Sequence, residues 1–250
     1  MKKTSAVIAN VALLILGWSI VSPSKAQQAA DVSADKTPTN KPTYYINLDS
    51  FEIQTFLPNP PTANSAVTRS ELLTLHRIED TRTAQTSAQA KFDEGSEDIF
   101  LFKDVMGAAF TPDNLPATAA LSKHIKLEQG AVGSRLKSSY SRMRPYQLDS
   151  SLHPICKVKT THDSYPSGHA LTGYLEALAL VELVPEKRDA ILVRADEYGQ
   201  ERLICGVHYP SDIEASKELA YAMFGYMLSV PSFQHDLAAA KVELNHKLHP

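Results

Sequence analysis

Residues 164–183 read SYPSGHALTGYLEALALVEL, and this stretch decides the expected fold. The tripeptide Pro166-Ser167-Gly168 is typical of the start of a helix. The apolar residues that follow recur at three- and four-residue spacing and would share one helical face: Leu171, Tyr174, Leu175 and Leu178. The stretch therefore predicts a helix over 167–183 with one apolar face.

Helical spacing continues on both sides of this segment. A helix is predicted from Ser65 onward, with Ser70 as a cap. Further helices are predicted over 99–110, 115–140, 187–203, 211–228 and 232–248. The helix over 115–140 is expected to break near Gly130 or Gly133. Because no convincing run of alternating strands is visible, the sequence predicts an all-α, single-domain bundle of about seven helices.

The N-terminal 26 residues have the pattern of a Sec-type signal peptide. Lys2 and Lys3 precede a mostly apolar run, and Ser24-Lys25-Ala26 ends it with small residues. A membrane anchor is the alternative, but the run is short for a spanning helix and no second one follows. We therefore expect a periplasmic or secreted protein that has no membrane contact after cleavage. Residues 27–62 are expected to form a flexible or extended arm, followed by a helical domain over 63–250.

Charge narrows the class of partner. The chain has 250 residues and a formal net charge of −3. Residues 1–26 contain three of the 25 basic residues and no acid, so cleavage leaves 22 basic and 28 acidic residues, a net charge of −6. A mildly acidic protein has no electrostatic footprint for nucleic acid. Any anion that it binds must therefore be held by a local cluster of basic side chains.

Three clusters contain the candidate chemistry: 137–145 (KSSYSRMRP), 164–169 (SYPSGH) and 202–212 (RLICGVHYPSD). Lys137 and Arg144 lie two helical turns apart, so they would share one face of a helix that Pro145 ends. Both side chains suit phosphate oxygens. The amides of a helix start at Gly168 also bind anions, with a further donor in the Ser167 hydroxyl.

His208 and Asp212 lie four residues apart at the start of a later helix. A carboxylate that accepts from one ring nitrogen fixes the tautomer and leaves the other nitrogen free to attack. Arg202 lies six residues before His208 and could reach the same anion, and His169 belongs to the first turn after Gly168. Each residue alone is commonplace, but together they indicate a reactive oxyanion site.

Cys156 and Cys205 are the only cysteines. In an oxidising compartment an even pair usually forms a disulfide, and closing a loop of roughly 50 residues would contribute about 4 kcal/mol in the chain-entropy model. Two buried free thiols are the alternative. We expect the disulfide, because both cysteines flank motifs that must meet at one anion.

The motifs Lys-x6-Arg-Pro, Pro-Ser-Gly-His and Arg-x5-His-x3-Asp resemble the signature of the type 2 phosphatidic acid phosphatase and vanadium haloperoxidase superfamily. The residues within these motifs are most similar to those of bacterial class A non-specific acid phosphatases. The resemblance implies a secreted all-α enzyme that hydrolyses small phosphate monoesters with broad specificity, without metal or cofactor. It implies that His208 forms a phosphohistidine, that Asp212 orients it and that His169 is the acid and base. The phosphate would be bound by Lys137, Arg144, Ser167, Gly168 and Arg202.

Several residues depart from the family pattern. Asp163, Ala170 and Glu201 stand where Gly, Thr and Ser are usual, and Tyr209-Pro210 replaces Trp-Gln. An acid beside the phosphate would repel it, so Glu201 is expected to point away or to pair with Arg142 or Arg202. We expect Asp163 to lie with His153 and His162 in a solvated loop that binds no metal.

Three other functions use the same features. A vanadium-dependent haloperoxidase would hold vanadate in the same cradle, with His208 as ligand, but the short chain argues against it. A membrane lipid phosphatase would need spanning helices. A phosphate-binding protein would not need His208 with Asp212. The sequence leaves a homodimer open.

Overall fold

The computed structural model describes residues 41–52, 55 and 57–248. The expected signal peptide and the first part of the expected arm lie outside the described residues. The described residues contain helices and no strand, so the prediction of an all-α class is confirmed. They belong to one compact unit that spans 38–250.

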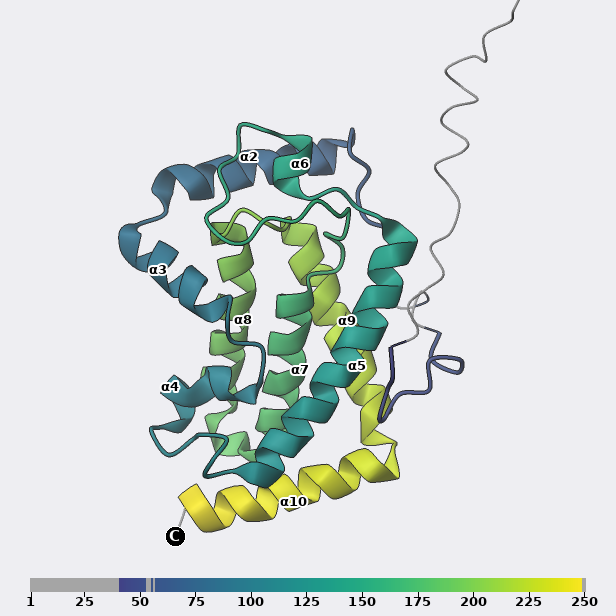
Figure 1. Cartoon of the computed structure of the whole chain (residues 1–250), viewed down its shortest axis with the longest axis vertical. Helices are drawn as coiled ribbons and strands as arrows, with labels where there is room; N and C mark the ends of the chain where they lie inside the picture. The colour runs from purple at the N-terminus through teal and green to yellow at the C-terminus, as the bar shows by residue number, and fades with distance from the viewer. Residues whose placement is uncertain (1–40, 53–54, 56, 249–250) are drawn as a thin grey trace, which may run out of the picture. The chain divides into compact units, whose positions relative to one another are not determined.

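The helices follow one another as α2 (Ala66–Thr81), α3 (Ala84–Asp93), η2 (Ile99–Phe102), α4 (Lys103–Met106), α5 (Pro116–Tyr140), α6 (Pro145–Leu148), α7 (Gly168–Leu183), η3 (Pro185–Lys187), α8 (Arg188–Ile204), α9 (Pro210–Leu228) and α10 (Pro231–Leu248). Helix α7 packs against α5, α8 and α9, and Figure 1 shows these four running side by side. Helices α2 and α6 lie across one end of them and α10 across the other (Figure 1).

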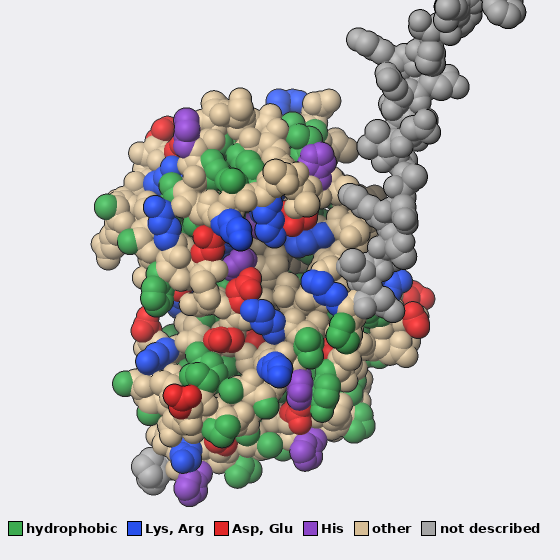
Figure 2. Space-filling model, viewed as in Figure 1, with side chains coloured by type: hydrophobic (Ala, Val, Ile, Leu, Met, Phe, Trp, Pro, Cys, Tyr) green, Lys and Arg blue, Asp and Glu red, His purple; other side chains and the backbone are tan. Residues whose placement is uncertain are grey.

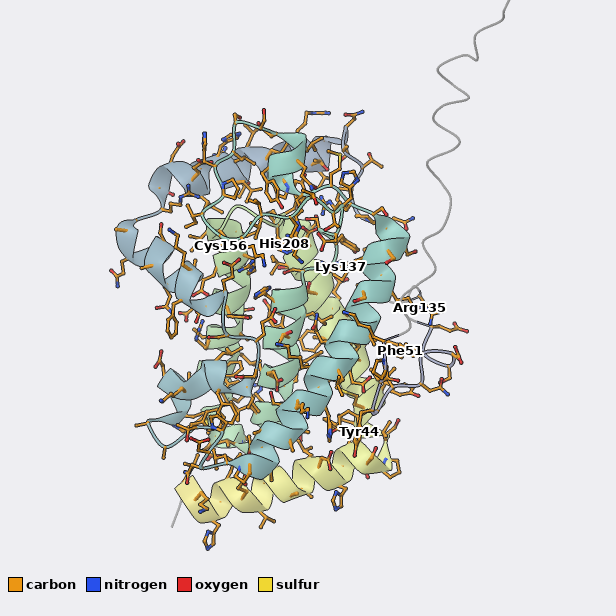
Figure 3. All side chains as sticks on the ribbon, viewed as in Figure 1. Tyr44, Phe51, Arg135, Lys137, Cys156 and His208 are labelled. Atoms are coloured by element: carbon orange, nitrogen blue, oxygen red, sulfur yellow. A yellow bond between two sulfur atoms is a disulfide. The ribbon has the colours of Figure 1, made fainter. Side chains whose placement is uncertain are left out.

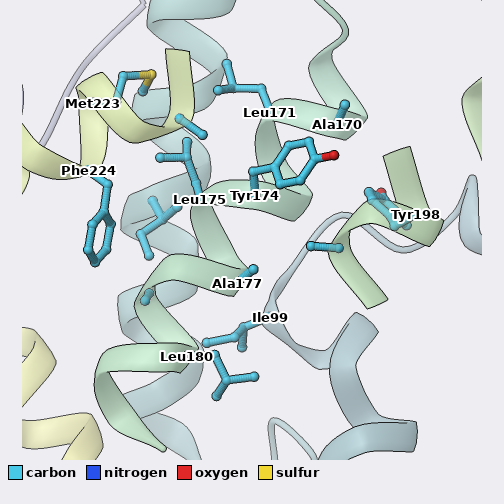
Figure 4. Close-up of a cluster of buried hydrophobic side chains, with 14 of the residues drawn as sticks. Ile99, Ala170, Leu171, Tyr174, Leu175, Ala177, Leu180, Tyr198, Met223 and Phe224 are labelled. Atoms are coloured by element: carbon cyan, nitrogen blue, oxygen red, sulfur yellow. The ribbon is translucent and has the colours of Figure 1, made fainter. Parts of the chain in front are cut away.

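Helix α7 is the centre of the core because it is apolar nearly all round. Its start agrees with the prediction: Ser167 is the N-cap, and its hydroxyl accepts from the Ala170 amide. Figure 4 shows the side chains of α7 packed among residues of neighbouring helices, including Tyr198 of α8. Gly173 lets α8 approach closely, since a Cβ there would lie 2.6 Å from the Tyr198 ring. The core is therefore built around the helix that begins at the PSGH motif.

The bounds predicted for the helix over 115–140 are confirmed, but the expected break and the expected role of Pro145 were wrong. Helix α5 continues from Pro116 to Tyr140 without a break at Gly130 or Gly133. A glycine inside a helix costs about 1 kcal/mol, and the buried apolar face of α5 offsets that cost. The helix ends when Ser141 adopts the left-handed conformation, with φ 47°. Pro145 does not end it but begins α6, where its fixed φ and missing amide suit the first turn.

Two further boundaries differ from the prediction. Ser65, rather than Ser70, caps α2, because its hydroxyl accepts from the Thr68 amide. The helical segment that begins at Ile99 ends at Met106, before Gly107. Gly107 has φ 101°, a conformation that favours glycine.

The described part of the arm packs on α5. Tyr45, Ile46 and Phe51 are buried. The amides of Tyr45 and Ile46 donate to the Glu128 carboxylate at 2.7 and 3.3 Å. Figure 3 shows Tyr44, Phe51 and Arg135 on this flank of the bundle.

Candidate active site

The three sequence clusters meet at one cavity of about 730 Å³, which is lined by residues of α3, α5, α7 and α8 and of the loops that precede or follow them. Six of the predicted site residues line it: Lys137, Arg144, Gly168, His169, Arg202 and His208. Figure 3 shows Lys137 and His208 at the same end of the bundle. The other two, Ser167 and Asp212, are fully buried directly behind the lining. The structure thus brings together segments that are far apart in sequence.

His208 is a buried histidine held by Asp212. Its Nδ1 lies 3.1 Å from Asp212 Oδ2. Because a carboxylate only accepts, Nδ1 carries the proton and Nε2 keeps its lone pair. Burial, followed by the charge of Arg144, lowers the pKa of His208 well below its usual value. The ring is therefore neutral, with an unprotonated Nε2.

Asp212 is held in place from three sides. Arg142 Nη1 donates to Oδ1 at 2.6 Å, and the Ser164 hydroxyl donates to Oδ2 at 2.6 Å. The Tyr209 amide also donates to Oδ2. Arg142 in turn pairs with Glu71 of α2 at 2.9 Å and stacks over the Tyr209 ring. Sequence reasoning missed Glu71, because nothing in the local pattern of α2 connects it with the motifs.

Arg144 faces His208. Its Nη1 lies 3.1 Å from His208 Nε2 and donates to the Val207 carbonyl at 2.9 Å. The prediction that Arg144 shares a helical face with Lys137 was wrong, since α5 ends at Tyr140 and Arg144 caps α6. Both side chains still reach the cavity, because the turn at Ser141 redirects the chain. Burial, then the charge of Arg144, lowers the pKa of Lys137 to about 7.

Asp163 belongs to the site. Its Oδ1 accepts from Arg144 Nε at 2.8 Å, its Oδ2 pairs with Lys159 at 3.2 Å, and its carbonyl accepts from Lys137 Nζ. Although burial opposes ionisation, Arg144 holds the pKa of the Asp163 carboxyl well below its usual range. The prediction of a solvated loop was therefore wrong for Asp163, which lines the cavity.

His169 lies beside the loop between α3 and η2. Its Nε2 lies 3.2 Å from Glu97 Oε1 and 3.1 Å from the Glu94 carbonyl. Burial, then the charge of Arg202, lowers the pKa of His169 to about 4, while Glu97 opposes that shift. Glu94 pairs with Arg202 at 3.5 Å. These two acids are further site residues that sequence reasoning missed, because nothing in their local sequence connects them with the three motifs.

Arg202 and the start of α7 complete the cavity wall. Arg202 is buried, and within the described part of the chain its Nε has no hydrogen-bond partner. Gly168 and His169 in the first turn of α7 both line the cavity. A buried cation with a spare donor and the start of a 16-residue helix are both suited to an anion.

Glu201 points away from the cavity, as expected. It lines a different pocket and approaches Arg194 at 3.7 Å, rather than Arg142 or Arg202. Burial, followed by Asp93, raises the pKa of Glu201 to about 8. The residue therefore adds no negative charge to the site at acidic pH.

The predicted disulfide between Cys156 and Cys205 is confirmed. The Ile155 amide also donates to the Cys205 carbonyl at 3.0 Å. Together these bonds attach the loop that leads to α7 to the segment that leads to His208. Figure 3 labels Cys156 and His208 at the same end of the bundle.

Two features are absent from the described residues. They contain no group of three or more His, Cys, Asp or Glu side chains placed to hold a metal ion. His153 instead pairs with Glu79 and is exposed. None of the described helices combines the length and the apolar character needed to cross a bilayer.

Comparison with known proteins identifies the family. Residues 119–236 match the PAP2 superfamily model. A non-specific acid phosphatase of Providencia stuartii is 31% identical over 82% of this chain and 86% of its own length. One of Salmonella typhimurium is 35% identical over 59% of this chain, and that alignment spans 60% of the Salmonella protein.

A solved structure supports the fold assignment alone. A bacterial vanadium-dependent iodoperoxidase superposes with a TM-score of 0.53, covering 71% of this chain and 53% of the other, at 16% identity. An identity this low shows a shared fold and does not favour a haloperoxidase. The Providencia alignment, the superfamily match and the fold agree: this chain belongs to the PAP2 superfamily and is similar to its non-specific acid phosphatases.

Proposed function

We propose that this chain hydrolyses phosphate monoesters in two steps through a phosphohistidine on His208, as a secreted enzyme of broad specificity. One observation carries the proposal. The unprotonated Nε2 of His208 accepts from Arg144 Nη1 at 3.1 Å and faces a cavity that Lys137, Arg144 and Arg202 also line. A neutral nucleophile surrounded by fixed cations suits phosphoryl transfer, in which negative charge spreads over the equatorial oxygens.

In the first step, His208 Nε2 forms a bond to phosphorus while the bond from phosphorus to the ester oxygen breaks. Protonated His169 gives its proton to the leaving oxygen, and the alcohol departs. In the second step neutral His169 takes a proton from water, the water oxygen bonds to phosphorus, and the bond to His208 breaks. Inorganic phosphate leaves and both histidines return to their starting states.

The shape of the site supports broad specificity. The cavity of about 730 Å³ is mostly polar and is open to solvent at its mouth, so it gives no close fit to one organic group. The signal-peptide pattern and the Cys156–Cys205 disulfide both favour an oxidising compartment outside the cytoplasm.

A rapid-quench experiment with ³²P-labelled aryl phosphate tests the mechanism. The parent protein should yield acid-labile, base-stable label on His208, and His208→Asn should yield none. His169→Asn is the matched histidine variant. With an aryl leaving group that needs no proton, it should still form the phosphohistidine but should hydrolyse it slowly, so that label accumulates. Turnover without any labelled histidine would contradict the mechanism.

A further inference from the structure

The charges around the cavity are unevenly distributed. Its lining contains seven Lys and Arg residues and only three Asp and Glu residues. All three acids contact groups at the inner end of the cavity: Asp163 contacts Arg144, Glu94 contacts Arg202, and Glu97 contacts His169. The inner site is therefore nearly balanced in charge before any phosphate binds.

The surplus positive charge belongs to four exposed lysines of the lining, of which Lys159 pairs with Asp163 and Lys41 precedes the packed part of the arm. Lys91 and Lys157 are both exposed and line the cavity. Within the described part of the chain, neither ammonium group forms an ion pair with a carboxylate. Figure 2 shows Lys and Arg side chains gathered around a histidine on this face of the molecule. Because the whole chain has a net charge of −3, this concentration is local.

Glu94 places these two lysines near the inner site. The Lys157 amide donates to the Glu94 carboxylate at 3.0 and 3.3 Å. Lys91 lies in the last turn of α3, and Glu94 is the C-cap of that helix. The same carboxylate approaches Arg202 at 3.5 Å. A phosphate bound to Arg202 would therefore share one cavity with the unpaired ammonium groups of Lys91 and Lys157.

We infer that Lys91 and Lys157 form a second anion site, and that the preferred substrates are monoesters whose organic part bears a second phosphate. This rests on the proposed function. The inner site would hold the phosphate that is cleaved, and the outer lysines would bind the phosphate that is retained. Since exposed ammonium groups are compact and mobile, the outer site would select for charge and not for one organic skeleton.

The test compares propane-1,3-diol bisphosphate with propyl phosphate, which share a skeleton without other recognition groups. At low ionic strength the parent protein should favour the bisphosphate in kcat/KM by about tenfold or more. Lys91→Met/Lys157→Met should reduce that preference by about five- to tenfold. An equal preference in the parent and in this variant would overturn the inference.

The matched control is Lys123→Met/Lys247→Met, which removes the same charge from exposed positions outside the cavity lining. Lys123 is about 21 Å along α5 from Lys137. The control should keep both the basal activity and the preference. If the control lowers the preference for the bisphosphate as much as the test variant does, the preference comes from the net charge of the protein and not from a second anion site.

Calorimetry separates this inference from the proposed function. Propane-1,3-diyl bisphosphonate and propylphosphonate are not hydrolysed, so their binding is measured without turnover. The bisphosphonate should bind the parent more tightly by about tenfold, and the test variant should lose most of that difference. If the parent protein shows this difference in binding but does not turn over phosphate monoesters, only the phosphatase mechanism is rejected. If the parent binds the bisphosphonate and propylphosphonate equally, the second anion site is rejected.

Discussion

Arg142 Nη1 lies 2.6 Å from Asp212 Oδ1, and this contact fixes the carboxylate that orients the candidate nucleophile. The opposite oxygen of Asp212 faces His208 Nδ1 at 3.1 Å. The guanidinium also pairs with Glu71 of α2. The orientation of His208 therefore depends on a chain of buried charges that extends away from the cavity and into α2.

Replacing Arg142 should lower kcat with little change in KM, because Arg142 contacts Asp212 and does not line the cavity that contains His208. We expect Arg142→Met to reduce kcat by about 10- to 100-fold, by analogy with the loss seen when the hydrogen-bonding partner of a metal-binding side chain is removed. Steady-state kinetics measure the split, and thermal melting checks that the variant is folded. Arg135→Met, which removes an exposed guanidinium bound to the Leu48 carbonyl, should leave kcat unchanged. A folded Arg142→Met protein with the parent kcat would contradict the prediction.

Glu97→Gln should shift the pH dependence of hydrolysis to lower pH. The negative charge of Glu97 raises the pKa of His169, so its removal should move that pKa further below about 4. At pH 5 and above, each unit by which the pKa of His169 falls reduces the protonated fraction of His169 about tenfold. Less His169 can then donate a proton. Alkyl esters, which need a proton on the leaving oxygen, should lose activity more than aryl esters.

Profiles of kcat/KM against pH for one alkyl and one aryl phosphate measure this difference. Asp113→Asn, in an exposed turn, is the control for a change of one charge and should keep the parent profile. A uniform loss for both substrates, without a shift along the pH axis, would show that Glu97 does not act through His169.

Asp163→Asn should bind inorganic phosphate more tightly. The amide oxygen can still accept from Arg144 Nε, but the negative charge beside Arg144 is removed. We expect the inhibition constant for phosphate to fall by about three- to tenfold at low salt, and by less at high salt, since screening weakens the effect. Competitive inhibition measured at several ionic strengths gives both values. The control is Glu201→Gln, which faces another pocket and should leave the inhibition constant and its salt dependence unchanged. Weaker inhibition by phosphate in Asp163→Asn would mean that the ionised carboxylate is needed to hold Arg144.

Removing the disulfide should destabilise the protein by about 4 kcal/mol, because it closes a loop of about 50 residues in the unfolded chain. Denaturant unfolding of Cys156→Ser/Cys205→Ser against the oxidised parent measures the difference. The reduced parent should resemble the double variant, and activity should be lost at lower denaturant concentration in both. Equal unfolding midpoints for the oxidised and reduced parent would contradict the prediction.

The helices and the motif residues were largely predictable because they depend on local patterns. The start of α7 at Gly168 follows from the PSGH motif, and its apolar face follows from residue spacing. The pairing of His208 with Asp212 follows from four-residue spacing at a helix start. The break expected in α5 was wrong, because burial against neighbouring helices outweighs the weak preference of two glycines.

The acids of the site could not be found in the same way. Glu71, Glu97 and Asp163 come from α2, from the loop before η2 and from the loop before α7, and each meets a cation or a histidine from a distant segment. The sequence alone determined which helices form and which residues are candidates to attack and bind phosphate. Both depend on the spacing of residues that lie close together in the sequence. Only the tertiary structure decided which carboxylates set the charge around them, because ion pairing in a buried site depends on distances that packing of the whole bundle creates.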